Sequence, residues 1–590
     1  MSPTDSMEET RRLHLVSWNV AGWRTTLDEV TRTTKAAKGR SAEAERQACL
    51  GAWLDRLEAD VLCLQETKLK RRDVEADARS LCATFDDGRW ETFWSCNDGA
   101  SGQRAGLNGV ATFVKRGTFP VLAADRRPLG DPELDDEGRC LVTFHGSFAL
   151  FNVYVPNGSG GARLAYKMRW LRALRAAMAN VRARGTPVVL AGDLNARHLP
   201  KDGHWTFRGV DGGALASAAA SESLDDAARA AFQKAADAWP AVRGALRDRD
   251  VAAVTTENPT NGEKHSKFRC RAKHVATRSP VQLSPYEASP DAARANYETE
   301  GYGVDADGTV VDLADALFPC RLPGVLDADR FLEAFEKLAS VQIPKAALRA
   351  ALDLGLLATA PPEPTRAGDL PRSATSWLRG LIDVDAMVDS LDAVHPDRAD
   401  RFTCWHQYTN KRYDNVGSRI DYVLVDAALF SSSKPVAGAL DRGLDEPPEA
   451  GGPDSPAAAH RAAVLDGHWA PAGFDGSGLR DGRATDYLHH STAPPHTGVR
   501  YTPPSWSDHV AVTLCLGAVP VPAPRAASTK RQLGDTQPHA KVRTITQFFS
   551  AAKPGANGAP APKPKPKPPA PPKRKPPTIS DFFAKKKSKP

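Results

Sequence analysis

The 590-residue sequence predicts an α/β fold built as a layered sandwich. Apolar runs of strand length alternate with helical periodicity, and several successive strands look like antiparallel pairs. The run 188–195 is typical, because four apolar residues lead into Gly192-Asp193-Leu194-Asn195. Side chains alternate along a strand, so Asp193 and Asn195 would face the same side at the edge of a sheet. A simple Asx turn is the alternative for this segment.

The first part of the chain supplies most of the strands. Helices are expected from about 43 to 58 and from about 164 to 184, where apolar residues recur at helical spacing. A Pro-Asn-Gly turn closes the strand that ends near Asn157. The expected strands span residues 13–20, 60–68, 90–94, 109–115, 140–144, 149–158 and 188–195.

Periodicity weakens after residue 205, and we predict two irregular insertions, at about 206–370 and 430–501. The first is rich in Ala, Asp and Pro, and it contains a basic stretch at 264–274 that is either a surface loop or a nucleic-acid contact. Helix-like pieces inside it span 227–239, 328–340 and 344–357. Outside the insertions, strands are expected at 402–405, 418–426 and 506–514, with a polar hairpin loop at 408–417.

Composition separates a folded part from a basic tail. The net charge is +7, but residues 518–590 hold 16 Lys/Arg against 2 Asp/Glu, so the rest of the chain is net negative. Whatever the folded part binds, it would therefore bind through a local patch and not through a global positive field. Nine scattered cysteines without a C-x-x-C pair argue against disulfides or a zinc site. The sequence contains no run of 18 apolar residues and no signal pattern, so we expect no membrane partner.

Polar residues stand at the ends of the predicted strands. Asn19, Glu66 and Asp193 end three buried strands, and Tyr154 and Asn157 end a fourth. One polar strand end is expected by chance, whereas four on separate strands indicate a site. Two further strands carry Asp421 and the pair Asp508-His509.

In this order the residues resemble the endonuclease/exonuclease/phosphatase superfamily, and within it the exonuclease III type of AP endonuclease. Each motif alone is weak, but seven in one order are specific. The resemblance covers about 11–205, 372–426 and 505–517, and it leaves out both insertions. The motifs are Ser17-Trp18-Asn19-Val20, Leu64-Gln65-Glu66-Thr67-Lys68, Glu137-Gly138-Arg139, Tyr154-Val155-Pro156-Asn157, Gly192-Asp193-Leu194-Asn195, Arg419-Ile420-Asp421-Tyr422 and Ser507-Asp508-His509.

The resemblance implies a four-layered α/β sandwich and hydrolysis of DNA phosphodiesters with Mg²⁺, for which Mn²⁺ can substitute. It makes Asp193 the base that activates water, and it pairs Asp421 with a protonated His509 that donates to the phosphate. Asn195 and Asn19 would hold water and phosphate, Tyr154 and Asn157 would contact the phosphate, and Arg139 would contact DNA. The implied metal-binding residues are Glu66, Asn19, Asp193, Asn195, Asp508 and His509.

Simple structural roles are the alternatives for three of these residues: a salt-bridge partner for Asp421, a packed histidine for His509 and a core residue for Tyr154. One position departs from the family, because Ala21 stands where an Asp or Asn is usual. A group of the metal or water shell is therefore missing, and we predict weaker metal affinity without loss of activity.

Four shorter sequence segments resemble the AP endonuclease 2 branch of this family. They are Lys167-Met168-Arg169, Gly109 to Phe113, His395-Pro396 and Phe402 to Trp405. Cys404 and Ser418 are small where the strongly endonucleolytic branch has an aromatic residue and a Trp. A looser pocket should discriminate less well for an internal abasic site. This implies 3′–5′ exonuclease and 3′-phosphodiesterase activities with weaker abasic-site endonuclease activity.

The tail, residues 518–590, is rich in Pro, Ala and Lys and is predicted to be disordered. Two islands in it, 542–549 and 576–583, have the spacing of peptides that bind the sliding clamp PCNA, although Val542 and Pro576 replace the usual Gln. The contacting residues would be Ile545, Phe548, Phe549, Ile579, Phe582 and Phe583. Lysine clusters such as Lys585-Lys586-Lys587 predict nuclear import, or else a DNA tether or simple solubility.

The expected organisation is thus a disordered N-terminus (1–10), a nuclease domain (11–517) and the tail. We expect a nuclear monomer whose partners are PCNA and DNA with abasic sites or with damaged or mismatched 3′ ends. Two alternatives remain: a catalytically weakened scaffold linked to PCNA, and another phosphodiesterase of the same superfamily.

Overall fold

The structure is a computed structural model that describes the chain in segments, all within one compact unit. The segments are 9–33, 41–76, 89–100, 104–157, 163–249, 251–257, 264–270, 302–304, 310–312, 325–357, 374–396, 401–406, 416–436, 495–500, 502 and 506–521. Of these, 251–257, 264–270, 302–304 and 310–312 are described by their backbone alone.

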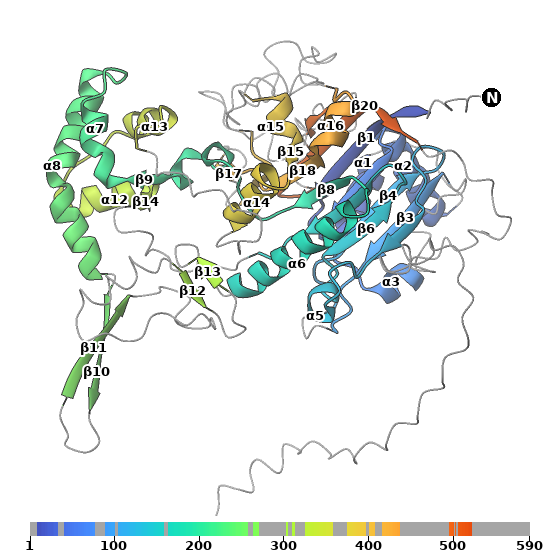
Figure 1. The fold of residues 1–590 in the computed structure, drawn as a ribbon, viewed down its shortest axis with the longest axis horizontal. Helices are drawn as coiled ribbons and strands as arrows, with labels where there is room; N and C mark the ends of the chain where they lie inside the picture. Colours follow the sequence, from blue (N-terminus) through green and yellow to red (C-terminus); the bar gives the residue numbers. More distant parts are fainter. Residues whose placement is uncertain are drawn as a thin grey trace, which may run out of the picture. The chain divides into compact units, whose positions relative to one another are not determined.

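Two six-stranded sheets of mixed direction form the centre of this unit (Figure 1). The pairs β1–β2 and β7–β8 are parallel, and the other neighbours are antiparallel. The first sheet has the order β19-β20-β1-β2-β4-β3, with β1 Thr10–Asn19, β2 Val61–Gln65, β3 Trp90–Ser95, β4 Val110–Lys115, β19 Gly498–Arg500 and β20 Ala511–Pro520. The second has the order β15-β18-β8-β7-β6-β5, with β5 Ala123–Asp125, β6 Cys140–Phe144, β7 Ala149–Tyr154, β8 Val188–Asp193, β15 Met387–Asp389 and β18 Asp421–Asp426.

The sheets pack face to face, and alternation along the strands explains how each is buried on both sides. In β1, Leu13 and Leu15 belong to the core between the sheets, whereas Val16 and Trp18 belong to a second core. Residues of β8 and β18, among them Val189 of β8, enter the core between the sheets from the opposite side. Strands buried on both faces read as continuous apolar runs, which is the pattern that the sequence shows.

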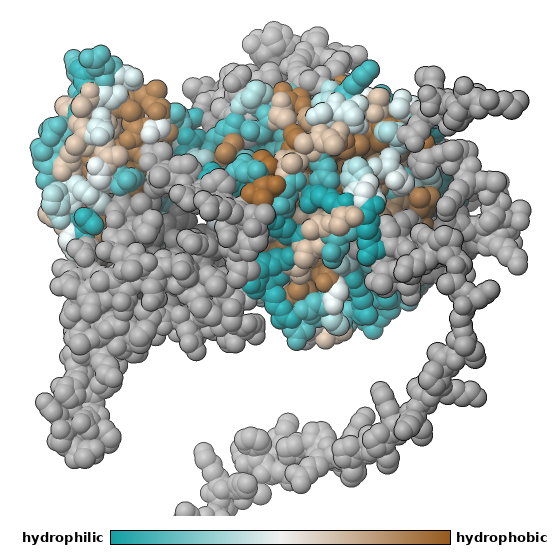
Figure 2. All heavy atoms as spheres, viewed as in Figure 1, coloured by the Kyte–Doolittle hydropathy of each residue, from teal (hydrophilic) through white to brown (hydrophobic). Residues whose placement is uncertain are grey.

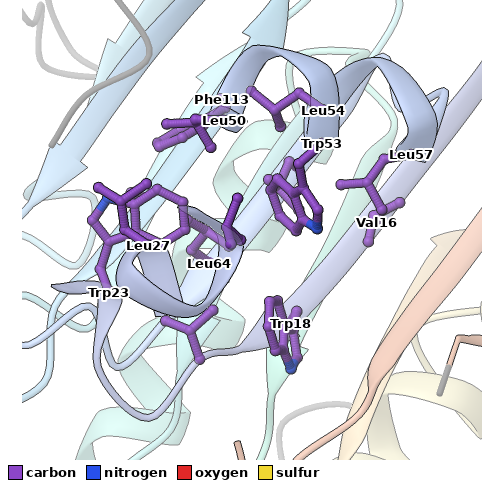
Figure 3. Packing of buried hydrophobic residues seen from close by; sticks show 14 of the residues in the cluster. Val16, Trp18, Trp23, Leu27, Leu50, Trp53, Leu54, Leu57, Leu64 and Phe113 are labelled. Atoms are coloured by element: carbon purple, nitrogen blue, oxygen red, sulfur yellow. The ribbon is translucent and has the colours of Figure 1, made fainter. Parts of the chain in front are cut away.

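Helices cover the outer faces. Helix α2 (Ala42–Leu57) starts where the Ser41 hydroxyl accepts a hydrogen bond from the Ala44 amide at 3.2 Å. Together with α1 (Trp23–Thr33) it closes an aromatic core in which the rings of Trp18 and Trp53 lie 6.4 Å apart (Figure 3). Helix α6 (Leu164–Arg182) covers the second sheet (Figure 1), and the Trp377 indole on α14 (Ala374–Asp383) donates to the Leu171 carbonyl at 2.8 Å. The four-layered α/β sandwich is therefore confirmed. The remaining helices are α3 Arg71–Ala76, α5 Pro132–Asp135, α15 Ser390–Val394 and α16 Ala427–Ser432.

The first insertion is more regular than the sequence predicted. It contains helices around a core of its own, formed by side chains such as Trp239, Phe331 and Phe335. The helix-like pieces expected at 227–239, 328–340 and 344–357 are confirmed, because helices span Asp226–Arg249, Ala328–Ala339 and Lys345–Asp353. The prediction of an irregular insertion did not include the common core that these helices form. Its helices are α7 Leu215–Ala219, α8 Asp226–Arg249, α12 Ala328–Ala339 and α13 Lys345–Asp353, and its 3₁₀ turns are η2 Pro200–Asp202, η3 Trp205–Phe207 and η4 Gly212–Ala214. Its strand pairs are β9 Gly209–Asp211 with β14 Val325–Asp327, β10 Val251–Glu257 with β11 Lys264–Cys270, and β12 Tyr302–Val304 with β13 Val310–Asp312.

Two boundaries of the predicted domain need comment. β20 continues to Pro520, which pairs with Thr10, so the sheet extends beyond the expected end at 517. Two short strands, β16 Cys404–Trp405 and β17 Gly417–Ser418, pair on either side of the predicted polar loop. Most of the loop, most of the second insertion and the tail beyond Val521 lie outside the described residues.

The described surface is mostly polar. Figure 2 shows one face of the molecule, on which hydrophobic areas lie among hydrophilic ones. Among the described residues, the large hydrophobic side chains that remain exposed are Leu107, Phe207 and Leu354. None of the helices in the described segments has the length and apolar character needed to cross a membrane.

Candidate active site

The predicted polar strand ends meet at one edge of the two sheets, and Asn19 joins the sheets there. Its side-chain amide donates to Oε1 of Glu66 at 3.1 Å and to Oδ2 of Asp193 at 3.0 Å. Glu66 follows β2 in the first sheet, whereas Asp193 ends β8 in the second. A single buried amide therefore positions both carboxylates.

Asp193 is held at the end of β8 by its local backbone. Gly192 has φ +142, and a Cβ there would lie 2.0 Å from the Val153 carbonyl oxygen, so only glycine lets β8 pass β7 at this point. The Asn195 amide N–H donates to Oδ1 of Asp193 at 2.8 Å, and the Asn195 side chain donates to the Val155 carbonyl at 3.0 Å. Asn195 itself lies in the left-handed region (φ +47), which Asn tolerates better than most residues. Asp193 and Asn195 are thus joined by an Asx turn, which was the alternative for this segment, and not by strand alternation, because β8 ends at Asp193.

His509 lies between two carboxylates. Its Nδ1 is 2.9 Å from Oδ2 of Asp421, and its Nε2 is 3.9 Å from Oδ2 of Asp193. The carboxylates are neighbours because Asp421 and Asp193 pair directly between β18 and β8. The Thr403 hydroxyl accepts from the amides of Ile420 and Asp421 at 3.0 and 3.1 Å and fixes the start of β18.

A chain of hydrogen bonds connects His509 to Asn19. The Ser507 hydroxyl donates to the Asn19 carbonyl at 2.7 Å and accepts from the His509 amide at 3.0 Å. The Trp18 indole donates to the His509 carbonyl at 3.2 Å. The segment before β20 is therefore fastened to β1, which explains why residues almost 500 positions apart share one site.

Burial and neighbouring charges set the protonation of these groups. Burial, together with the negative charge of Asp421, raises the pKa of Asp193 to about 7. Burial opposes the charged form of His509, but Asp421 outweighs it and raises the pKa of this histidine well above its usual value. Burial likewise opposes ionisation of Glu66, yet the Lys68 ammonium and the Asn19 amide lower the pKa of Glu66. The site thus favours a charged imidazole and an ionised Glu66, whereas the raised pKa of Asp193 lets this carboxylate take up a proton near neutral pH.

Tyr154 lies beside the carboxylates, and Arg139 lies against its ring. The Arg139 guanidinium is buried, binds Glu137 at 2.5 Å and stacks 4.8 Å from the centre of the Tyr154 ring. The charge of Arg139 is engaged within the domain by Glu137 and Tyr154, and its contact with a DNA phosphate stays a prediction. Burial and the charges of Glu66 and Asp193 raise the pKa of Tyr154, so its hydroxyl stays protonated.

A cleft of about 680 Å³ opens beside these residues. Glu66 and Asp508 line it together with the small residues Cys404 and Ser418, which pair between β16 and β17. The sequence analysis gave no role to two further lining residues, Lys68 and Phe207. Lys68 lies in the motif Leu64-Gln65-Glu66-Thr67-Lys68, whereas no motif in the sequence surrounds Phe207.

The remaining predicted site residues are Asn157 and those of the clamp-like motifs. Asn157 is exposed just after Pro156, beyond the end of β7. The six hydrophobic residues of the two clamp-like motifs lie outside the described residues.

The residues fit a hard divalent cation. Glu66 and Asp508 offer carboxylate oxygens to the same cleft, and magnesium prefers one or two carboxylates with phosphate oxygens and waters. The Lys68 ammonium, 3.0 Å from Oε2 of Glu66, shows that positive charge is accommodated there. Potential ligand atoms of Cys404, Asp508 and His509 lie within 4.8 Å of one another, and so do those of Asp193, Asp421 and His509. A protonated His509 has no free lone pair, which leaves the oxygen donors as the better ligands.

Parts of the chain are similar to known proteins. Residues 16–249 match the Endonuclease/Exonuclease/phosphatase family. The chain is 33% identical over 225 residues to DNA-(apurinic or apyrimidinic site) endonuclease 2 of Bos taurus and to that of Homo sapiens, and each match covers 33% of this chain and 40% of the relative. The crystal structure of the Xenopus laevis APE2 catalytic domain superposes with a TM-score of 0.38 at 17% identity, over 87% of this chain and 94% of that one. Residues 16–249 are thus similar to the Endonuclease/Exonuclease/phosphatase family, and the chain spans about 40% of the length of the AP endonuclease 2 relatives that it matches.

Proposed function

We propose that this chain is a magnesium-dependent DNA repair nuclease that hydrolyses phosphodiesters mainly at 3′ ends, as a 3′–5′ exonuclease and 3′-phosphodiesterase with weaker abasic-site endonuclease activity. The observation that carries the proposal is the single hydrogen-bonded constellation of Asn19, Glu66, Asp193, Asp421 and His509 beside a cleft. The names of the relatives support a DNA substrate.

In this proposal Asp193 takes a proton from the attacking water. A general base works best when its pKa is close to the working pH, and burial raises the pKa of Asp193 to about 7. Asn195 and Asn19 keep its carboxylate oriented from two sides through the hydrogen bonds described above. Pre-orientation of this kind lowers the cost of reaching the transition state.

The protonated His509 donates from Nε2 to a phosphate oxygen as negative charge builds up. Asp421 fixes the ring through Nδ1 and stabilises its positive charge. Tyr154 keeps its phenolic proton and offers a second donor. When bound, a divalent cation held by Glu66 and Asp508 neutralises charge on the phosphate.

The shape of the cleft supports the preference for 3′ ends. Cys404 and Ser418 leave its wall open where bulkier side chains would close around a flipped abasic sugar. A loosely enclosed sugar spends less of its time in the productive orientation, so incision at internal abasic sites should be the slower reaction.

We further infer that the protein is a nuclear monomer that PCNA recruits through the tail motifs at 542–549 and 576–583. Support comes from the sequence, which places two Ile-x-x-Phe-Phe patterns in a tail with few other aromatic residues. Two weak motifs gain affinity on a clamp that offers several identical sites.

The decisive experiment measures turnover of a 3′-recessed duplex with Mg²⁺, in parallel with a duplex that carries an internal abasic site. Wild-type protein should trim the recessed end faster than it incises the abasic site. Glu66→Ala and Asp193→Asn should each abolish turnover, and the matched control Glu333→Gln, on an exposed face of α12, should not. Abasic incision that clearly exceeds trimming would contradict the preference, and activity retained in Glu66→Ala would support a scaffold or another site.

A further inference from the structure

The start of the first insertion turns an aromatic side chain into the substrate cleft. Phe207, at the end of η3, is 38% exposed and lines the cleft together with Cys404 and Ser418. Two other aromatic residues that line the cleft, Trp405 and Trp506, are almost fully buried and pack within the domain. His406, which also lines the cleft, is exposed. The exposed ring of Phe207 is therefore available to contact a ligand in the cleft.

Phe207 is held firmly on both sides. The His204 amide donates to the Gly417 carbonyl at 2.9 Å, and Gly203 bridges to Ser418, so the turn is attached to β17 at the rim of the cleft. Behind Phe207, the His204 ring packs edge-on against it at 6.2 Å and against the buried Phe402 at 6.3 Å. The ring therefore has a rigid backing.

The insertion supplies the other anchor. Trp205, two residues before Phe207, belongs to the core of the insertion, and the Arg208 carbonyl accepts the Ala328 amide at 3.1 Å at the start of α12. One short turn thus places one aromatic ring in the insertion core and the next in the cleft. The insertion has a direct route by which it shapes the cleft.

We propose that Phe207 stacks on the nucleobase of the 3′-terminal nucleotide and is a specificity-determining residue of the cleft. This inference rests on the proposed DNA 3′-end nuclease function. Every base has an aromatic face, so stacking on a rigid phenyl ring suits recognition of a strand end without regard to sequence. The cleft volume of about 680 Å³ is in the range of pockets that hold molecules of nucleotide size. Phe207 restores an aromatic surface that Cys404 and Ser418 do not provide.

The test is a binding cycle that combines two proteins with two DNA ends, in EDTA so that no DNA is cleaved. The duplexes end at the 3′ side either in an intact nucleotide or in a tetrahydrofuran abasic analogue. Phe207→Ala should weaken binding of the base-ended duplex by about tenfold, and it should leave binding of the abasic-ended duplex unchanged. Phe207→Tyr should keep wild-type affinity. As matched control, Leu354→Ala removes an exposed hydrophobic side chain elsewhere in the insertion and should change neither affinity.

A spectroscopic readout checks the contact itself. With 2-aminopurine as the 3′-terminal base, wild-type protein and Phe207→Tyr should quench its fluorescence on binding, and Phe207→Ala should not. Equal affinities of Phe207→Ala and wild type for both ends, an equal loss for both ends, or unchanged quenching would overturn the inference. Failure of wild-type protein to bind or trim DNA would instead reject the proposed function, so the two failures are distinguishable.

Discussion

Nδ1 of His509 lies 2.9 Å from Oδ2 of Asp421, and Asp421 is the direct cross-strand partner of Asp193. The histidine is therefore held by one carboxylate and directed towards another. Because all three side chains are buried, removing one charge should change the behaviour of the other two.

Replacing the Asp421 carboxylate should reduce catalysis more than binding. In Asp421→Asn, burial of His509 is no longer offset by a negative charge, so the charged imidazole is disfavoured. We expect kcat on a 3′-recessed duplex to fall by roughly 100-fold or more, with little change in KM. Steady-state kinetics would measure this, with Asp392→Asn on α15 as control. A loss confined to KM would contradict the role given to Asp421.

Restoring a carboxylate at residue 21 should strengthen metal binding. Ala21 lines the cleft at φ +51, and its carbonyl accepts the Lys68 ammonium at 2.7 Å. An aspartate there would tolerate this backbone and draw Lys68 away from Glu66. Ala21→Asp should bind Mg²⁺ about fivefold more tightly. This factor corresponds to ~1 kcal/mol, which is the interaction energy of two unit charges about 4 Å apart in water.

Isothermal titration calorimetry would measure this affinity. Ala21→Gly is the control, because it relieves the positive φ without adding a ligand. Ordinary affinity in wild type and no gain in Ala21→Asp would show that the missing group does not matter.

The buried ion network beneath the site should dominate stability. The fully buried Arg419 binds Asp202 at 2.8 Å and Asp389 at 2.6 Å. Arg419→Met leaves two buried carboxylates without their cation, so we expect the free energy of unfolding to fall by roughly 3–5 kcal/mol. In the exposed pair of Arg89 and Asp55, Arg89→Met should cost less than about 1 kcal/mol. Urea denaturation of both variants provides the comparison, and similar losses would contradict it.

Buried histidines should make the domain sensitive to acid. Burial lowers the pKa of His14 to about 3 and that of His145 to about 4, from an ordinary value of 6.5. Both are neutral when folded but accept protons when unfolded, so their contribution is complete above pH 6.5 and is lost as the pH falls towards 4.

His145→Gln should therefore lose less stability between pH 7.5 and 4.5 than wild type does, by on the order of 2 kcal/mol. The measurement is the difference between the unfolding free energies of one protein at the two pH values, which cancels any constant cost of the substitution. His406→Gln, at an exposed position, should keep the wild-type pH dependence. An unchanged dependence in His145→Gln would refute this explanation.

The two tail motifs should act together. Phe549→Ala combined with Phe583→Ala should remove retention on immobilised PCNA, whereas each single change should weaken it only in part, because the second motif still binds. Lys565→Ala, in the Pro-Lys run between the motifs, is the control. Retention of the double variant would end the clamp proposal.

Most strands and the long helix followed from the sequence, since burial on both faces leaves uninterrupted apolar runs. The helix expected at 164–184 spans Leu164–Arg182, and the strand ends at Asn19, Glu66 and Asp193 do converge. The helix-like pieces expected in the first insertion are also present, but the core that they share depends on contacts between segments far apart in the chain.

By itself, the sequence predicted the fold class, the resemblance to the family and the residue types of the site, because these depend on local periodicity and on motifs in a set order. Only the tertiary structure decided how three of the residues act. It buries Arg139 against Tyr154, sets Lys68 against Glu66 and brings Phe207 from the insertion into the cleft. The physical reason is that exposure and charge pairing arise between segments far apart in the chain, and no local pattern records which segments meet.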